Sequence, residues 1–198
     1  MPQYFDFTVS LQDVIPRPWR RFLIRSTSRF AALHSAIQDA CGWTNSHLYL
    51  FRAAGDYQHD VIAGLRLEDG DDDMNGPVPS AEQTHVARYF GVEGRTTCLY
   101  VYDFADDWTH DVQLNDIVTL PDRFTRRLLG GEHAFPPDDS GGAHRYTIIQ
   151  KARRTGKDPE GLVDWVRGTW DWTGEFDLEK TRRAFDKAPR ASSGIQPS

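Results

Sequence analysis

The chain has 198 residues, of which 39% are hydrophobic and 12% aromatic, so it can pack a core without a structural metal or disulfide. Its 29 acidic and 23 basic residues give a formal net charge of -6, which disfavours nucleic acid as a partner. No apolar run reaches the ~20 residues of a membrane span, and the first ten residues lack the pattern of an export signal. We therefore expect a soluble, cytoplasmic protein with no membrane contact.

The first 26 residues predict a β-hairpin. Apolar and polar side chains alternate over residues 4–14 and again over residues 19–26, as they do in strands with one solvated face. Pro16 and Pro18 interrupt the alternation, because proline cannot donate a hydrogen bond within a sheet. Two such strands on either side of a short proline turn indicate an antiparallel pair.

A helix is expected next. Apolar residues recur at intervals of three and four over residues 30–41, which predicts a single buried stripe. The Ser-Thr-Ser cluster at 26–28 offers N-cap side chains, and Gly42 suits the left-handed residue that follows a helix. Cys41 and Cys98 lack metal-ligand spacing, so we expect two reduced thiols.

The remaining segments place the chain in the α+β class. Strands are expected at residues 43–53, 59–67, 98–104, 108–114 and 146–150. Helices are expected from Ser80 to about residue 91, from Asp158, and over residues 178–187. We predict a mixed or antiparallel sheet of about five to six strands packed against the first helix. One domain would span residues 1–188, including a C-terminal helical appendage at about 158–187, with a disordered tail at 189–198.

The block from Tyr102 to Asp111 carries the first group of candidate site residues: Asp103, Asp106, Asp107 and His110. Carboxylates suit hard divalent cations, and imidazole can act in acid–base chemistry near neutral pH. A two-residue turn at 106–107 would place Asp103 opposite His110. A three-residue turn at 105–107 would place Tyr102 opposite His110 and keep Tyr102, Phe104 and Trp108 on one apolar face. We favour this second register, in which His110 packs in the core and the acids form the turn.

The loop from Gly130 to Gly142 supplies the second group. Its centre holds Pro136-Pro137-Asp138-Asp139, where proline stiffness could fix the Asp138 and Asp139 carboxylates. The competing interpretation is an ordinary surface turn. His47, which precedes the apolar run of the strand expected at residues 43–53, could also reach a pocket.

Two weaker patterns complete the candidates. Asp71, Asp73, Asn75 and Glu82 match the spacing of a calcium-binding EF-hand loop, but no helix is expected before it and prolines stiffen it. Arg17, Arg20 and Arg21 form a basic cluster that could contact nucleic acid, although such clusters are usually solvated surface.

Several motifs together resemble the plasmid pRiA4b ORF-3-like family, whose members occur on plasmids, chromosomes and mobile elements. The resemblance covers about residues 4–185. It rests on five motifs: Pro16–Arg21 after Leu11, Leu33–Leu48, Tyr102–His110, Pro136–Gly142 and Phe176–Glu179. The chain departs from the family at Ala105, where glycine is usual, and at Asp139 and Ser140. The resemblance implies a compact α+β domain with no established activity.

Two functions are therefore considered. The chain lacks nucleophile-elbow, Walker, dinucleotide-binding and zinc-peptidase motifs, which favours a soluble binding or accessory module with a protein partner. The alternative is a divalent-metal-dependent hydrolase or phosphotransfer enzyme that uses the two acidic groups. That alternative requires the two loops to meet in space.

Overall fold

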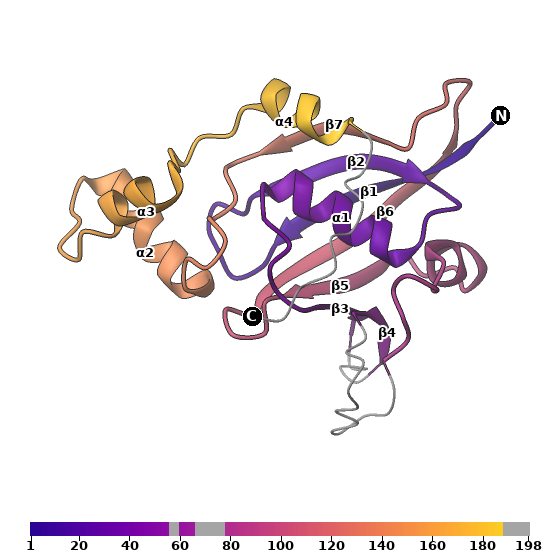
Figure 1. Ribbon diagram of the computed structural model, residues 1–198, viewed down its shortest axis with the longest axis horizontal. Helices are drawn as coiled ribbons and strands as arrows, with labels where there is room; N and C mark the ends of the chain where they lie inside the picture. Colours follow the sequence, from indigo (N-terminus) through magenta and orange to yellow (C-terminus); the bar gives the residue numbers. More distant parts are fainter. Residues whose placement is uncertain (56–59, 66–77, 188–198) are drawn as a thin grey trace.

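The protein is described from a computed structural model, which describes residues 1–55, 60–65 and 78–187 (Figure 1). Within these residues the strands form one seven-stranded antiparallel sheet, in the order β4-β3-β5-β6-β1-β2-β7. The strands are β1 (Gln3–Leu11), β2 (Trp19–Arg25), β3 (Tyr49–Ala53), β4 (Val61–Gly64), β5 (Thr97–Tyr102), β6 (Trp108–Thr119) and β7 (Arg126–Glu132). The helical segments are α1 (Phe30–Cys41), a short π-helical turn η1 (Arg88–Val92), α2 (Gly142–Thr155), α3 (Leu162–Trp170) and α4 (Leu178–Phe185).

The predicted α+β class is confirmed, but the sheet has seven strands rather than five to six. Strand β7 was not predicted, because its Arg-Arg and Gly-Gly pairs hide the apolar alternation of a strand. The strand expected at residues 146–150 is wrong. Tyr146, Ile149 and Ala152 recur every third residue and bury one face of α2.

The first hairpin is confirmed, with register from Tyr4 opposite Arg25 to Ser10 opposite Trp19. Helix α1 ends as expected at Gly42, which has φ 83°. Its predicted N-cap is wrong. The first amide groups of α1 instead donate to main-chain carbonyls of a turn at residues 80–84: Phe30 N to Thr84 O and Ala31 N to Ala81 O, both at 3.0 Å.

That turn replaces the helix expected from Ser80 to about residue 91. Thr84 bonds back to the Ser80 carbonyl through its amide and its hydroxyl, and only the short η1 follows. The sequence pattern of a helix N-terminus is therefore used to cap α1 rather than to begin a second helix.

Helices α1 and α4 lie across one face of the sheet, while α2 and α3 are grouped at one end (Figure 1). Aromatic side chains dominate the core, including Trp108, Tyr100 and Tyr102, which are fully buried. At the α2–α3 end, Ile149, Leu162 and Val166 form a smaller apolar cluster.

The predicted helix start at Asp177 is confirmed, whereas the one predicted at Asp158 and Pro159 lies too early in the chain. Asp177 accepts from Lys180 N at 2.9 Å and caps α4. Asp158 accepts from the amides of Leu162 and Val163, so α3 begins four residues after it and not at Pro159. Across residues 1–55, 60–65 and 78–187, no helix combines the length and apolar character that a membrane crossing requires.

Candidate functional site

The β5–β6 hairpin has a longer turn than either predicted register. Tyr100 pairs with His110 and Tyr102 with Trp108, which leaves residues 103–107 as the turn. Asp103 has φ 55°, and its Oδ1 accepts from Ala105 N at 3.1 Å and from Asp106 N at 3.4 Å. This side-chain turn fixes the Asp103 carboxylate at the end of β5. Phe104, expected on the apolar face, points outward and is 52% exposed.

His110 is a core residue and does not belong to the acidic group. Its side chain is fully buried, and Nδ1 lies 3.0 Å from the Trp108 carbonyl oxygen, to which it donates. Burial lowers the pKa of His110 to about 4, because the charged ring would lose its hydration. The imidazole is therefore neutral at physiological pH and serves packing.

The Pro-Pro-Asp-Asp loop is anchored to the segment that connects α1 to β3. Trp43 Nε1 donates to the Pro136 carbonyl at 2.8 Å, and Ser140 Oγ donates to the Pro137 carbonyl at 2.7 Å. These bonds position Asp138, which is 5% exposed, directly above the segment that connects α1 to β3.

The two oxygens of Asp138 have opposite environments. Oδ2 accepts four hydrogen bonds: from Thr44 N, Thr44 Oγ1, Ser46 Oγ and Tyr102 OH, at 2.8–3.3 Å. Oδ1 is buried and has no hydrogen-bond partner among the described residues. An orphaned buried carboxylate oxygen is costly, so its surroundings need an explanation.

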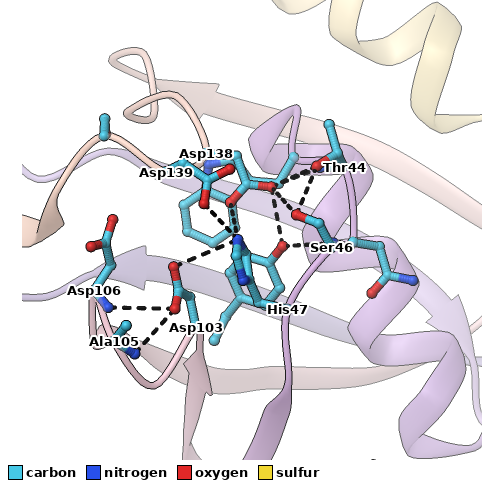
Figure 2. A network of polar contacts seen from close by, with 12 residues as sticks. Thr44, Ser46, His47, Asp103, Ala105, Asp106, Asp138 and Asp139 are labelled. Carbon is cyan, nitrogen blue, oxygen red and sulfur yellow. Dashed lines mark hydrogen bonds and ion pairs between the residues drawn. The ribbon is translucent and has the colours of Figure 1, made fainter. Parts of the chain in front are cut away.

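His47 occupies the space that Asp138 Oδ1 faces (Figure 2). His47 Nε2 lies 2.7 Å from Asp139 Oδ1, 3.7 Å from Asp103 Oδ2 and 4.0 Å from Asp138 Oδ1. One ligand atom each from His47, Asp103 and Asp139 lie within 4.8 Å of one another. The structure thus brings the hairpin turn, the proline loop and His47 together in one histidine–carboxylate cluster.

Backbone contacts lock the two acidic loops together. Asp106 Oδ2 accepts from Gly141 N at 2.8 Å. Gly142 has φ 76°, and a Cβ atom there would lie 2.8 Å from the main-chain oxygen of Asp106. Asp106 therefore positions the cluster from outside it, and Gly142 permits the close approach.

The other predicted site residues lie elsewhere. Asp107 is exposed and accepts from Thr109 Oγ1. Glu82 is exposed in the turn that caps α1, whereas Asp71, Asp73 and Asn75 lie outside the described residues, so the calcium-loop pattern is not tested there.

The three arginines of the basic cluster do not form one surface. Arg20 is 3% exposed and donates to the carbonyls of Ala40, Trp19, Glu132 and His133. Arg21 forms a bidentate pair with Asp6, and Arg17 pairs with Asp111. Arg20 is thus a structural residue, and carboxylates already neutralise the other two.

Sequence reasoning missed three residues that support the cluster: Thr44, Ser46 and Tyr102, the donors to Asp138 Oδ2. A usable signal was present, because Thr44–His47 is a run of four polar residues between the apolar Trp43 and the strand that follows. Such a run has no packing role of its own and therefore indicates a polar site.

The fold and the cluster together define an α+β protein with an antiparallel sheet and a histidine–carboxylate site at one end of a hairpin. The chain belongs to the plasmid pRiA4b ORF-3-like protein family, whose model matches residues 3–180. It is 31% identical over 183 residues to the uncharacterized protein y4hQ of Sinorhizobium fredii. The aligned region covers 92% of this chain and 87% of y4hQ. The crystal structure of MM3350, a protein of unknown function from Methanosarcina mazei, is similar with a TM-score of 0.75. That match has 26% identity and covers 90% of this chain and 96% of that one.

Proposed function

We propose that this protein is a binding module that holds a divalent cation between His47 Nε2 and the carboxylates of Asp103, Asp138 and Asp139. The observation that carries the proposal is the unpartnered Oδ1 of Asp138, which is buried and faces His47 Nε2 at 4.0 Å. Four donors satisfy the other oxygen and hold the carboxylate in place. A bound cation supplies the missing partner.

Charge supports the same conclusion. Three carboxylates surround one imidazole, and the described ion pairs of Asp103, Asp138 and Asp139 involve only His47. Like charges held this close repel one another unless a cation or proton intervenes. In a cation shell with bonds of about 2.0–2.2 Å, neighbouring ligand atoms are roughly 3–4 Å apart. The distances from His47 Nε2 to the three carboxylates are 2.7–4.0 Å, close to this range. Atoms of His47, Asp103 and Asp139 also lie within 4.8 Å of one another, and Asp138 Oδ1 lies beside that group.

The donor set selects among cations. Calcium takes six to eight oxygen ligands and magnesium retains several waters, whereas imidazole favours zinc and its neighbours in the first transition row. One nitrogen and up to three carboxylate oxygens therefore suit Zn²⁺ or Mn²⁺ best. Zinc should bind more tightly than manganese, and both more tightly than magnesium, following the general order of divalent affinities.

In this proposal the cation joins the hairpin turn to the proline loop and so fixes the surface that a protein partner would recognise. A second candidate, a metal-dependent hydrolase or phosphotransfer enzyme, is favoured by one observation. The Asp139 side chain is 57% exposed and that of His47 29%, so one side of the cluster is open to water or substrate. Catalytic metal sites keep such an open position.

The experiment is calorimetric titration of the metal-free protein with Zn²⁺, Mn²⁺, Mg²⁺ and Ca²⁺. The decisive variant is Asp138→Asn, which retains an oxygen for the Thr44 and Ser46 donors and removes the negative charge that faces His47. Asp107→Asn is the matched control, because it makes the same change in an exposed residue of the neighbouring turn.

We expect one zinc per chain, an affinity at least ~100-fold lower for Asp138→Asn, and an unchanged affinity for Asp107→Asn. Absence of zinc and manganese binding to the folded protein would overturn the proposal. Metal-dependent hydrolysis of a nitrophenyl phosphate ester that Asp138→Asn abolishes would select the enzymatic candidate over the binding module.

A further inference from the structure

A second polar feature lies away from the cation cluster, where the turn between β1 and β2 approaches α2. A hollow of about 520 Å³ opens there. Its lining consists of Ile15, Pro16, Thr147, Gln150, Lys151, Arg153 and Arg154. The lining includes three cationic side chains and no carboxylate. In a chain with a net charge of -6, such a local excess of positive charge calls for an explanation.

The positive charge is a property of α2 as a whole. Its sequence, GAHRYTIIQKARRT, contains four basic residues and no acidic one. Thr147, Lys151 and Arg154 follow at intervals of four and three, which places them on one face of the helix. All three are exposed, whereas Tyr146, Ile149 and Ala152 bury the opposite face.

The three cations differ in how far they are already engaged. Arg153 donates to the carbonyls of Thr173 and Gly174 and lies over the Trp172 ring, so it holds the C-terminal segment against α2. The side chains of Lys151 and Arg154 form no ion pair with any residue in the described ranges. They are the two charges that remain available to a ligand.

The opposite side of the hollow is apolar. Ile15 is 87% exposed, and Pro16 lies beside it at the tip of the hairpin. A ligand that matches this lining therefore has an anionic end for Lys151 and Arg154 and a flat or apolar part for Ile15 and Pro16. The volume falls within the range of about 300–1,000 Å³ typical of small-molecule sites.

We propose that this hollow binds a phosphate-bearing small molecule of nucleotide size. Lys151 and Arg154 would contact the phosphate through charge-assisted hydrogen bonds, with Thr147 and Gln150 as further polar partners. A free nucleotide fits better than a nucleic-acid strand, because the net negative charge repels a long polyanion while a small ligand responds chiefly to the local cations.

The test is calorimetric titration with adenosine diphosphate in buffer that contains EDTA, so that the cation cluster plays no part. Adenosine tests the requirement for phosphate, and inorganic phosphate tests the contribution of the apolar part. We expect a dissociation constant below about 1 mM for the nucleotide and markedly weaker binding of both fragments. The variant Asp138→Asn should bind the nucleotide normally, which separates this proposal from the cation site.

Variants on the helix face make the test specific. Lys151→Glu and Arg154→Glu should each weaken nucleotide binding at least ~10-fold. Lys180→Glu is the matched control, since it makes the same charge change at an exposed position of α4, and its affinity should stay within about twofold. Ile15→Ser should weaken binding of the nucleotide but not binding of inorganic phosphate. If Arg154 were only a structural residue, Arg154→Glu would lower the melting temperature and leave nucleotide affinity unchanged, which would contradict the proposal.

Failure of the wild-type protein to bind the nucleotide would overturn the proposal. So would an equal loss of affinity in Lys180→Glu, because the effect would then be general electrostatics. A ten-residue thymidine oligonucleotide that binds more tightly than the nucleotide, through the same two residues, would overturn the choice of a small ligand in favour of a nucleic-acid strand.

Discussion

His47 and His110 lie against the same layer of aromatic rings but have opposite roles. His47 meets the Tyr102 ring edge-on, and its side chain is 29% exposed among three carboxylates. His110 lies edge-on to Trp43, is fully buried, and its hydrogen-bond partners are main-chain carbonyls. An imidazole buried without an anion stays neutral and packs, whereas His47 lies at the surface beside carboxylates, where we propose that a cation binds.

The largest expected effect is a loss of stability at low pH, which arises from the buried histidines. Burial lowers the pKa of His34 and of His110 to about 4, below the ordinary value of 6.5. The folded state therefore favours the neutral rings, and their contribution to stability is complete above pH ~6.5 and lost as pH falls toward 4. Between pH 7 and pH 5 the free energy of unfolding should drop by about 2 kcal/mol for each histidine.

Urea denaturation in EDTA at the two pH values measures this drop. The variant His110→Ala should show a smaller decrease than the wild-type protein, because only one of the two buried histidines remains. A free energy of unfolding that is flat between pH 7 and pH 5 would contradict the burial of His34 and His110 as neutral rings.

Removal of the buried ring should destabilise the protein without touching the cation site. His110→Ala removes a fully buried side chain and the hydrogen bond from Nδ1 to the Trp108 carbonyl. We expect the free energy of unfolding to fall by about 2–4 kcal/mol. Zinc affinity of the folded variant, measured by calorimetry, should stay within about twofold of wild type. A large loss of zinc binding would place His110 in the site after all.

Substitution of His47 should have the opposite result: a large loss of zinc affinity and little change in the free energy of unfolding. His47→Ala removes the one nitrogen among the proposed ligands, so zinc affinity should fall at least ~100-fold, equivalent to about 2.7 kcal/mol. The free energy of unfolding without metal should change by no more than about 0.5 kcal/mol, since the side chain is part exposed. Calorimetry and denaturation of one preparation measure both quantities. Zinc affinity within tenfold of wild type would remove His47 from the ligands.

The smallest effect concerns the contact between the two loops. Gly142→Ala adds a Cβ atom 2.8 Å from the Asp106 main-chain oxygen at a residue with φ 76°. It should lower the free energy of unfolding by about 1–2 kcal/mol and weaken zinc binding several-fold. Gly156→Ala is the control, because φ is 68° there and nothing lies within 4 Å of the added atom. Equal effects on zinc binding would show that the loop contact does not shape the site.

Local patterns predicted the elements whose causes are local. The hairpin of β1 and β2, the end of α1 at Gly42 and the cap at Asp177 each follow from a few adjacent residues. The errors arose where a distant contact decides the outcome. Ser80 suggested a helix start, yet its turn provides carbonyls to the first amides of α1, fifty residues earlier in the chain.

The sequence predicted the types of residue in the candidate site, but not which of the named residues belong to it. His47, Asp103, Asp138 and Asp139 were all named from the sequence. Asp107 and His110 were also named but lie outside the cluster, as the favoured register predicted for His110. The favoured register correctly placed His110 in the core, but the five-residue turn pairs it with Tyr100 rather than Tyr102 and leaves Phe104 exposed. Register depends on the packing of whole strands, and a sequence with several acids near a turn permits more than one.

The most direct test of the cation site is X-ray diffraction from crystals grown with zinc, using anomalous scattering at the zinc edge to locate the metal. We expect one strong peak per chain, about 2.0–2.2 Å from His47 Nε2 and within bonding distance of Asp138 Oδ1 and at least one of Asp103 and Asp139. A peak only at other surface residues, with Asp138 Oδ1 still unpartnered, would contradict it.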